Sequence, residues 1–292
     1  FSLAAARLGW QLESVLVRGL HAGPFERLRP DLAPRRRLIV TVRDGDAVRG
    51  LAAWLGDEGF GDSTLHVMEA LGGPREHLRT CRAREYALEE VQHPVAIAIE
   101  VVGGGAVVHR SGGQADDLFD HDGQITKRPV RAMTLSALSP NPGERLWDIG
   151  AGSGSIGLEW LMADPSMQAI AVEARAHRVA NIRANAAKLG QARLDAVEGT
   201  APEALAGLPK PDAVFVGGGL SQATLDWLEA HLASGTRLVA NAVTLETEAL
   251  LVAAASRLGG TLTKVELSEA QPLGQFRGWK AAYPVVQWSV IL

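Results

Sequence analysis

The sequence predicts an α/β protein whose larger, carboxyl-terminal part is a doubly wound sheet with an antiparallel edge. Three observations lead to this prediction: β-branched runs alternate with helical segments, a glycine-rich turn joins one run to a helix, and a glycine triplet at 103–105 divides the chain. At 292 residues the chain is long for one domain and comfortable for two. We therefore expect two domains, over residues 1–106 and 107–292.

Strands and helices alternate in the first domain. The β-branched run at 38–42 lies between an arginine triplet and an Asp-Gly-Asp turn, which predicts a strand. Residues 47–58 place apolar side chains on one side and stop at Gly59, which predicts a helix. Three further segments complete this α/β unit: strands at 63–68 and 94–102, and a polar helix at 76–91.

The second domain follows a linker rich in glycine and aspartate at 111–122. Its apolar periodicity then alternates between the helical and the extended pattern. Helices are expected at 129–138, 155–162, 176–189, 221–233 and 244–258. Strands are expected at 145–149, 168–172, 195–197, 213–216, 236–241 and 261–266, with two final strand-like pieces inside 279–291 that form the antiparallel edge.

Composition argues against several classes of protein. The chain carries 29 basic and 33 acidic residues, for a net charge of −4, and has only 5% aromatic residues. No broad basic field or base-stacking surface for nucleic acid is therefore expected. The single cysteine, Cys81, makes neither an internal disulfide nor a multi-cysteine zinc site. No apolar run has the length of a membrane helix. The start at Phe1 indicates a cut inside a longer protein, with a secreted start after processing as the weaker alternative, and we expect a soluble cytoplasmic protein.

The most informative segment is the strand–turn–helix sequence Leu-Trp-Asp-Ile-Gly-Ala-Gly-Ser-Gly-Ser-Ile-Gly at 146–157. Glycines let the backbone approach a ligand where any Cβ would clash. A plain tight turn would explain the glycines alone equally well. Further features nearby favour a ligand.

Acidic residues flank this turn. Asp148 lies two residues before the first glycine, a poor place for a pyrophosphate but a good one for the sulfonium and amine of S-adenosylmethionine. Glu173 ends the next strand, where an acid accepts ribose hydroxyls. A nicotinamide dinucleotide would explain Glu173 but not Asp148, so it is the weaker alternative. The segment 199–201 follows the third strand, where an adenine edge would lie.

A second glycine run, 217–219, follows the strand at 213–216 and faces the ligand side of such a sheet, although a structural turn is the alternative. The Asn/Asp-Pro-Pro-aromatic tetrad of amino-methylating nucleic-acid enzymes is missing there. The candidate cofactor-binding residues are Asp148, Gly150, Gly152, Gly154, Glu173, Gly199, Thr200, Ala201, Gly217 and Gly218.

The segment at 120–131 precedes the first helix of the second domain and carries three cations. Lys127, Arg128 and Arg131 have the chemistry to bind carboxylates of an acidic substrate, although a solvated helix start is an equally good explanation. His121 is a candidate acid/base group, whereas His177 is expected at the surface.

These motifs together resemble the decarboxylating precorrin-6Y C5,15-methyltransferases of cobalamin biosynthesis. The similarity covers about 107–292, and the lead-in Gly-Gln-Ile-Thr-Lys-Arg-x-Val-Arg is far more specific than a glycine loop shared by all class I methyltransferases. Motifs of the first domain, among them Glu-Ala-Leu-Gly-Gly-Pro at 69–74, resemble the carboxyl-terminal half of class III tetrapyrrole methylases. The amino-terminal half, with its donor loop, is not in this chain.

The resemblance implies a Rossmann-like class I methyltransferase domain that uses S-adenosylmethionine. It implies methylation of carbon 15 of precorrin-6Y and loss of the ring C acetate carboxylate to give precorrin-8, with carbon 5 methylated by the other domain of the full enzyme. It also implies a homo-oligomer, expected as a tetramer, without nucleic acid, membrane or metal. The candidate substrate-binding residues are Gln124, Thr126, Lys127, Arg128 and Arg131, and the candidate proton donors are His121 and Asp120.

Two rival functions stay open at this point. An RNA or protein methyltransferase shares the class I fold but would need a basic or aromatic surface. A non-catalytic module that binds S-adenosylmethionine as a sensor would keep the donor site without transfer to a tetrapyrrole.

Overall fold

The computed structural model describes all 292 residues, and the chain divides into two compact units. The first unit comprises Phe1–Val108 with Lys188–Gly190, and the second comprises His109–Ala187 with Gln191–Leu292. No helix in either unit has the length and apolar character needed to span a membrane. We describe each unit separately.

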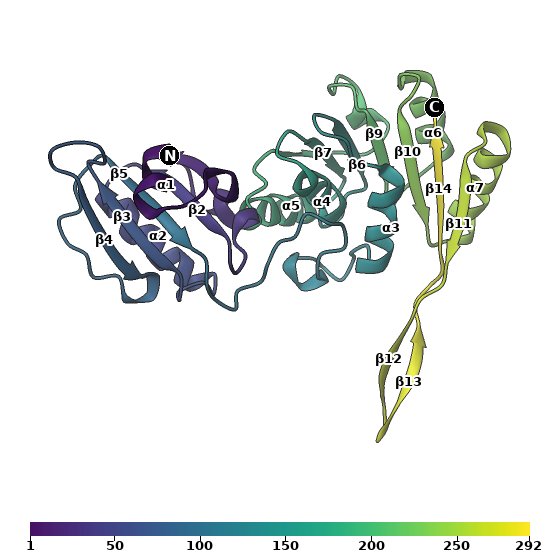
Figure 1. The fold of residues 1–292 in the computed structure, drawn as a ribbon. Helices are drawn as coiled ribbons and strands as arrows, with labels where there is room; N and C mark the ends of the chain where they lie inside the picture. Colours follow the sequence, from purple (N-terminus) through teal and green to yellow (C-terminus); the bar gives the residue numbers. More distant parts are fainter. The chain divides into compact units, whose positions relative to one another are not determined.

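The first unit is a five-stranded sheet in the order β1-β2-β5-β3-β4 (Figure 1). Only the β1–β2 pair is parallel. The core forms between α2 and one face of the sheet, where Leu38, Val40, Leu51 and Leu55 are fully buried. The strands are β1 (Leu16–His21), β2 (Arg37–Val42), β3 (Thr64–Glu69), β4 (His77–Arg82) and β5 (Val95–Glu100), and the helices are α1 (Ser2–Leu8) and α2 (Gly45–Asp57).

The helix predicted at 76–91 is wrong. This segment contains β4 and the short 3-10 turn Ala83–Glu85. β4 pairs antiparallel with β3 along its whole length and keeps most of its side chains in solvent as an edge strand. Pairing with a neighbouring strand overrides the polar composition that suggested a helix.

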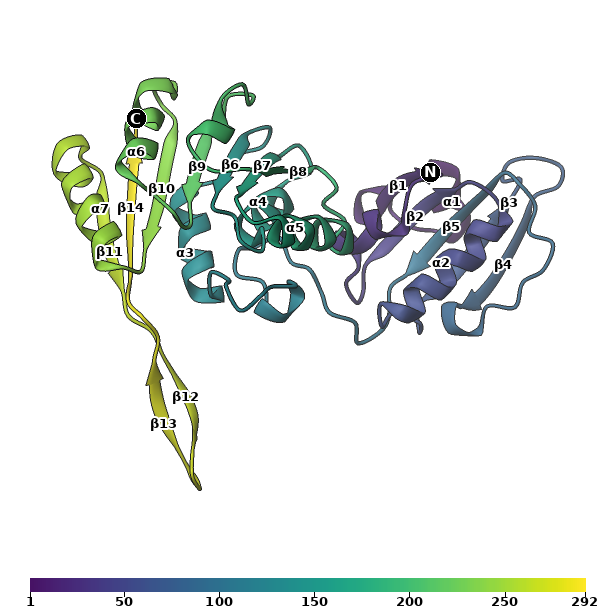
Figure 2. The ribbon, with the colours of Figure 1, turned by 180° about the vertical axis from the view of Figure 1, so that it is seen from behind.

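The second unit is a seven-stranded sheet in the order β11-β14-β10-β9-β6-β7-β8 (Figures 1 and 2). The pairs from β10 to β8 are parallel, and β14 runs antiparallel to both of its neighbours. This confirms the predicted doubly wound α/β sheet with antiparallel strands at one side. The strands are β6 (Arg145–Ile149), β7 (Gln168–Glu173), β8 (Leu194–Glu198), β9 (Ala213–Val216), β10 (Arg237–Ala242), β11 (Thr261–Val265) and β14 (Val285–Ile291).

Helices cover both faces of this sheet. Leu225 of α6 and Leu251 of α7 pack with Trp147, Val214 and Leu238 on one face. Asp148, the neighbour of Trp147, points to the other face and contacts α4. The helices are α3 (Arg128–Leu138), α4 (Ser155–Ala163), α5 (Ala176–Lys188), α6 (Gln222–His231) and α7 (Leu245–Leu258), and all five are confirmed within three residues of the predicted bounds.

A hairpin that was not predicted joins β11 to β14. The strand-like piece expected between Trp279 and Pro284 belongs to its second strand, and only the piece after Pro284 lies in the antiparallel part of the main sheet. β12 (Ser268–Leu273) pairs antiparallel with β13 (Phe276–Ala281), and both extend past the ends of β11 and β14 in Figures 1 and 2. Every residue of β12 is exposed, so no alternation of buried and exposed side chains marks the strand. Leu273, Phe276 and Trp279 are 68%, 80% and 79% exposed.

Candidate functional site

A cavity of about 340 Å³ lies at the carboxyl ends of the central strands in the second unit. The loops after β6 and β9 form its floor, and residues of the lead-in segment 124–127 line one wall. Ligands of open α/β sheets bind at this edge of the sheet. The structure therefore brings three of the predicted motifs together in one place.

The glycine-rich loop forms the floor of the cavity. Gly150 has a φ of 67°, and a Cβ there would lie 2.4 Å from the carbonyl oxygen of Gly218, so the two loops touch through backbone atoms. Gly152 has a φ of 60°, and a Cβ there would meet nothing closer than the Gln124 carbonyl at 3.7 Å. The bare backbone of Gly152 thus faces open space, which allows close approach of a ligand. Gly154 caps α4 behind the loop, with Ile182 as its nearest neighbour.

Glu173 ties the glycine-rich loop to the end of the neighbouring strand. One carboxylate oxygen accepts the amide of Gly152 at 2.9 Å, and the other accepts the amide of Arg175 at 3.0 Å. The residue is 5% exposed. A carboxylate that holds two main-chain amides still has lone pairs for two hydroxyl groups of a ligand.

Asp148 lies behind the loop and does not border the cavity. Its Oδ2 accepts the amide of Gly157 at 2.9 Å, while Oδ1 is buried without a partner. Burial raises the pKa of Asp148 to about 7, which the Gly157 hydrogen bond partly offsets and the charge of Glu173 reinforces. The Ser153 hydroxyl, which does border the cavity, is a second buried polar atom without a partner. Unpaired buried polar atoms are costly, so the Ser153 hydroxyl fits a site completed by a ligand, whereas Asp148 is separated from the cavity by the loop.

The residues predicted beside an adenine edge lie next to Glu173 but outside the cavity. The Gly199 amide donates to the Glu173 carbonyl at 3.0 Å. Thr200 and Ala201 follow it, and their carbonyls accept hydrogen bonds from Ala204 and Thr224. Gly217 and Gly218, by contrast, line the cavity as expected from their position after β9.

The lead-in segment is clamped to α5 through Asp122. Its carboxylate accepts hydrogen bonds from Arg178 Nε at 2.8 Å, His177 Nε2 at 3.2 Å and the main-chain amide of Gln124 at 3.1 Å. Hydrogen bonds from Arg178 first, then His177 and Gln124, hold the pKa of Asp122 well below its usual range. This clamp places Gln124, Thr126 and Lys127 on the cavity wall.

Two cations border the cavity, and sequence reasoning identified only one of them. Lys127 is predicted and present, with Nζ 3.7 Å from Asp116 and the side chain 58% exposed. Arg178 was not predicted, because its helix position gives no sign that Asp122 directs it toward the cavity. Arg128 is exposed at the start of α3 and does not reach the cavity.

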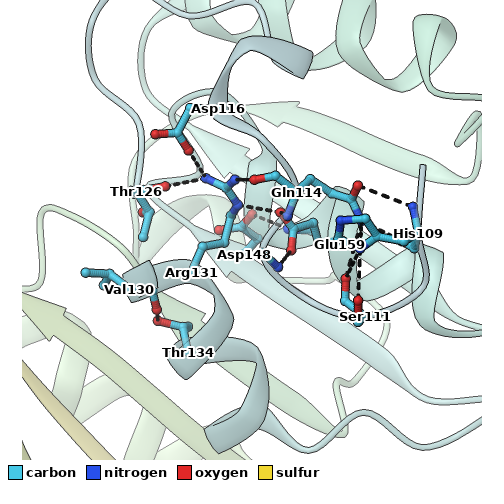
Figure 3. A network of polar contacts seen from close by, with 12 residues as sticks. His109, Ser111, Gln114, Asp116, Thr126, Val130, Arg131, Thr134, Asp148 and Glu159 are labelled. Atoms are coloured by element: carbon cyan, nitrogen blue, oxygen red, sulfur yellow. Dashed lines mark hydrogen bonds and ion pairs between the residues drawn. The ribbon is translucent and has the colours of Figure 1, made fainter. Parts of the chain in front are cut away.

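Arg131 differs from the expectation of a substrate ligand, because its side chain is fully buried (Figure 3). Its guanidinium donates to Glu159 at 2.5 Å, to Asp116 at 3.0 Å and to the main-chain carbonyls of Thr126 and Gln114. The chain's own groups therefore take up four of its five N–H donors. Arg131 ties the lead-in segment to Glu159 of α4 and is not accessible to a substrate carboxylate.

The candidate proton donors are not brought to the cavity either. His121 is exposed, and its Nδ1 accepts the amide of Gly123 at 3.0 Å. The main chain of Asp120 is held by the Asn185 side chain at 2.7 and 2.9 Å. Neither residue lines the cavity.

Sequence reasoning also missed the far wall of the cavity, which is apolar apart from one side-chain amide and the hydroxyl of Tyr283. Val243, Leu267, Tyr283 and Val285 line it, together with Asn241 from the end of β10. A polar residue at the carboxyl end of the strand predicted at 236–241 was the available signal for Asn241.

The fold and the site define a class I methyltransferase: a doubly wound sheet with antiparallel β14, a glycine-rich loop after β6 and an acid at the end of β7. An S-adenosylmethionine-dependent O-methyltransferase from Thermotoga maritima shares this fold, with 15% identity and a TM-score of 0.51 over 82% of this chain and 96% of its own.

Comparison with known proteins narrows the class. The profile of the precorrin methyltransferase domain family matches residues 117–292. Precorrin-6Y C(5,15)-methyltransferase [decarboxylating] from Sinorhizobium sp is 50% identical over 99% of this chain and 70% of its own length. The Mycobacterium tuberculosis protein of the same name is 43% identical over 99% of this chain and 73% of its own. The chain belongs to the decarboxylating precorrin-6Y C(5,15)-methyltransferase family and is a methyltransferase.

A solved structure supports the same assignment for the second unit. The C-terminal domain of precorrin-6Y C5,15-methyltransferase from Rhodobacter capsulatus is 52% identical, with a TM-score of 0.62 over 63% of this chain and all of its own.

Proposed function

We propose that the second unit transfers a methyl group from S-adenosylmethionine to carbon 15 of precorrin-6Y and removes the ring C acetate carboxylate, giving precorrin-8 in cobalamin biosynthesis. One observation carries the proposal. A single cavity joins a glycine cradle to two cations and an apolar wall, and the cradle is held by Glu173, which is not itself on the cavity wall. These features match, in turn, a cationic donor with ribose hydroxyls and an acidic, flat, conjugated acceptor.

The residues around the glycine-rich loop fit S-adenosylmethionine, which supplies an electrophilic methyl group on a sulfonium. Gly152 leaves room for the ligand, Glu173 has lone pairs for the ribose hydroxyls, and Ser153 has an unpaired hydroxyl at the cavity wall. Asp148 adds a buried carboxyl behind the loop, whose pKa burial raises to about 7. A sulfonium is reactive enough that the protein's main task is to position the acceptor carbon.

The other half of the cavity fits the tetrapyrrole acceptor. Lys127 and Arg178 are the only charged residues on the cavity wall, and cations suit the peripheral carboxylates of a precorrin. Gln124 and Thr126 lie beside them. The apolar side chains of Val243, Leu267 and Tyr283 suit the face of the conjugated ring.

For the first unit we propose the carboxyl-terminal half of a class III tetrapyrrole methylase domain, which methylates carbon 5 in the full enzyme. The alignment with the Sinorhizobium relative supports this, because it covers 99% of this chain and so includes the first unit. Carbon-13 NMR of the product would show whether a methyl group is added at carbon 5 as well as at carbon 15, and methylation at carbon 15 alone would leave the proposed role of the first unit unsupported.

We also propose that the chain forms a homo-oligomer, expected as a tetramer, through the second unit. The β12–β13 hairpin supports this, since it leaves Leu273, Phe276 and Trp279 in solvent. Large apolar side chains gathered on one projecting element mark an association surface. Sedimentation of the purified chain tests this, and a monomer over the micromolar range would contradict it.

The central experiment is calorimetric titration with S-adenosylmethionine and, separately, with NAD, followed by addition of precorrin-6Y and mass analysis of the product. We expect binding of the methyl donor, no binding of NAD, and a tetrapyrrole that has gained one methyl group and lost carbon dioxide. Donor binding without any change in the tetrapyrrole would favour another acceptor, such as RNA or protein, or a sensor. Binding of NAD instead would contradict the assignment of the glycine-rich loop.

A further inference from the structure

Three buried polar side chains meet behind the apolar wall of the cavity. They are Thr134 of α3, Asn241 of β10 and Gln287 of β14, which are 0%, 9% and 7% exposed. Asn241 and Gln287 are direct partners in the antiparallel β10–β14 pair. Of the three residues, only Asn241 borders the cavity.

Each hydrogen bond among these residues has a defined donor and a defined acceptor. The Thr134 hydroxyl donates to the Val130 carbonyl at 2.9 Å, so its oxygen is left as an acceptor (Figure 3 shows this bond). Asn241 Nδ2 and Gln287 Nε2 each donate to that oxygen at 3.0 Å. Gln287 Nε2 also donates to Asn241 Oδ1 at 3.0 Å. A flipped Asn241 amide would place two acceptors face to face, so the network sets its orientation.

The network takes up only half of the hydrogen-bonding capacity of the Asn241 side-chain amide. Of its two Nδ2 protons one is bound by Thr134, and of its two Oδ1 lone pairs one is occupied by Gln287. Outside this network, Asn241 lines the cavity. An N–H that is fixed in direction and unpaired in the protein is suited to a ligand acceptor atom.

Asn241 lies in the part of the cavity that belongs to the acceptor. In the sheet, β9 separates β10 from β6 and β7, which carry the glycine-rich loop and Glu173. Phe215 of β9, which pairs with Val239, and Val285 of β14, two residues before Gln287, line the same cavity. Both charged wall residues belong to other elements, the lead-in segment and α5. The Asn241 amide is therefore a neutral donor in an uncharged region.

We propose that the Asn241 amide binds the carboxylate that the acceptor loses as carbon dioxide. The proposal rests on the proposed function and assigns the two kinds of carboxylate to two places: retained carboxylates at Lys127 and Arg178, the departing one at Asn241. A carboxylate gives up its negative charge as it decarboxylates. An ion pair would stabilise the starting carboxylate and raise the barrier, whereas one neutral N–H orients it with less stabilisation of that state.

Methyl transfer and decarboxylation together balance in atoms and electrons without an oxidant or a reductant. The ring carbon supplies the electron pair of the new carbon–carbon bond to the methyl group, and sulfur keeps the pair of the broken bond. When the bond to the carboxyl carbon breaks, its pair enters the conjugated ring and carbon dioxide leaves. The positive charge of the donor and the negative charge of the carboxylate cancel. The exocyclic methylene then gains one proton from water to become a methyl group, and the ring carbon that received the new methyl group loses its own proton to water.

The test uses the full chain with precorrin-6Y and S-adenosylmethionine. It measures the fraction of the methylated product that has also lost carbon dioxide. Asn241→Leu removes the amide at similar volume, and Asn241→Asp keeps the shape but adds a like charge. We expect the proportion of methylated product that has lost carbon dioxide to fall about tenfold or more in both variants, because the departing carboxylate is no longer held in the orientation from which its carbon–carbon bond breaks. S-adenosylmethionine affinity should stay within about twofold of the unchanged chain.

Two controls separate this role from a structural one. Thr134→Val removes the anchor of the amide without touching the acceptor, so it should shift the same product ratio by a smaller factor. Binding of precorrin-6Y with S-adenosylhomocysteine present gives a readout without turnover, and Asn241→Asp should weaken it about tenfold. Folded variants that keep the original product ratio would overturn the inference. An unchanged precorrin-6Y with the original chain would instead overturn the proposed function, and the inference with it.

Discussion

Gly152 donates its main-chain amide to the Glu173 carboxylate over 2.9 Å, which joins the loop after β6 to the end of β7. We therefore expect Glu173→Gln to weaken S-adenosylmethionine binding by about 1–3 kcal/mol, because it removes a charged acceptor and disturbs the loop. Glu198→Gln is the matched control, since Glu198 pairs with Glu173 on the next strand but is exposed. Calorimetry of both folded variants tests this, and equal affinities would contradict the assigned role of Glu173.

Gly152 is expected to be needed for the ligand more than for the fold. Gly152→Ala and Gly143→Ala both place a side chain at positive φ, 60° and 88°, with no protein atom closer than 3.7 Å. Each should cost about 1–2 kcal/mol of stability. Only Gly152 lines the cavity, so only Gly152→Ala should lower donor affinity about tenfold or more. A similar loss of affinity in both variants would show that strain alone is responsible.

Asp148 should make donor binding depend on pH. Burial raises its pKa to about 7, so the carboxyl holds its proton near pH 6 and is ionised near pH 8. The donor carries positive charge, so its affinity should rise as the pH increases through about 7. Asp148→Asn should flatten that rise, which calorimetry at several pH values would show. An unchanged slope in the variant would assign the pH dependence to another group.

The raised pKa of Asp148 also affects the stability of the protein without ligand. Stability should fall with increasing pH, whereas donor affinity should rise. The folded state holds the Asp148 proton up to about pH 7, whereas the unfolded chain releases it near the ordinary value of 3.8. The free energy of unfolding should therefore fall as the pH rises between these values. In urea titrations without ligand, Asp148→Asn should lack this decline, and a parallel decline in both proteins would contradict the prediction.

Lys127 is expected to act on the acceptor alone. Its side chain borders the cavity but is 58% exposed, so Lys127→Ala should weaken precorrin-6Y binding by only about 1 kcal/mol. Donor affinity should not change. Arg128→Ala is the control on the neighbouring residue, which does not line the cavity. Fluorescence titration with the tetrapyrrole measures both, and a larger effect of Arg128→Ala would reverse the assignment.

Arg131 should matter for stability. It is fully buried and pairs with Glu159, whose side chain is 1% exposed, so Arg131→Met leaves that carboxylate buried without its cation. The expected loss is about 3–5 kcal/mol in the free energy of unfolding. Arg128→Met, exposed on the same helix, should change it by less than about 0.5 kcal/mol. Urea denaturation compares the two, and similar values would contradict the structural role.

Much of the second unit could be read from short stretches of sequence. The strands at 145–149 and 213–216 have the predicted bounds, because buried parallel strands are short apolar runs that end at glycine. The first unit was harder, since exposed β4 carries a polar sequence that also fits a helix. The hairpin of β12 and β13 was not predicted, because its exposed strands likewise show no alternation of buried and exposed side chains.

Local chemistry explains what the sequence by itself determined: the doubly wound fold, the glycine-rich loop and the acid at the end of the next strand. Each of these depends on residues within one strand–turn–helix unit. Tertiary structure decided which side chains reach the cavity. It buried Arg131 against Glu159, turned Arg178 toward the site through Asp122, and joined Asn241 to Thr134 across 107 residues. Such contacts arise only when distant segments pack together, and no periodicity within one segment encodes them.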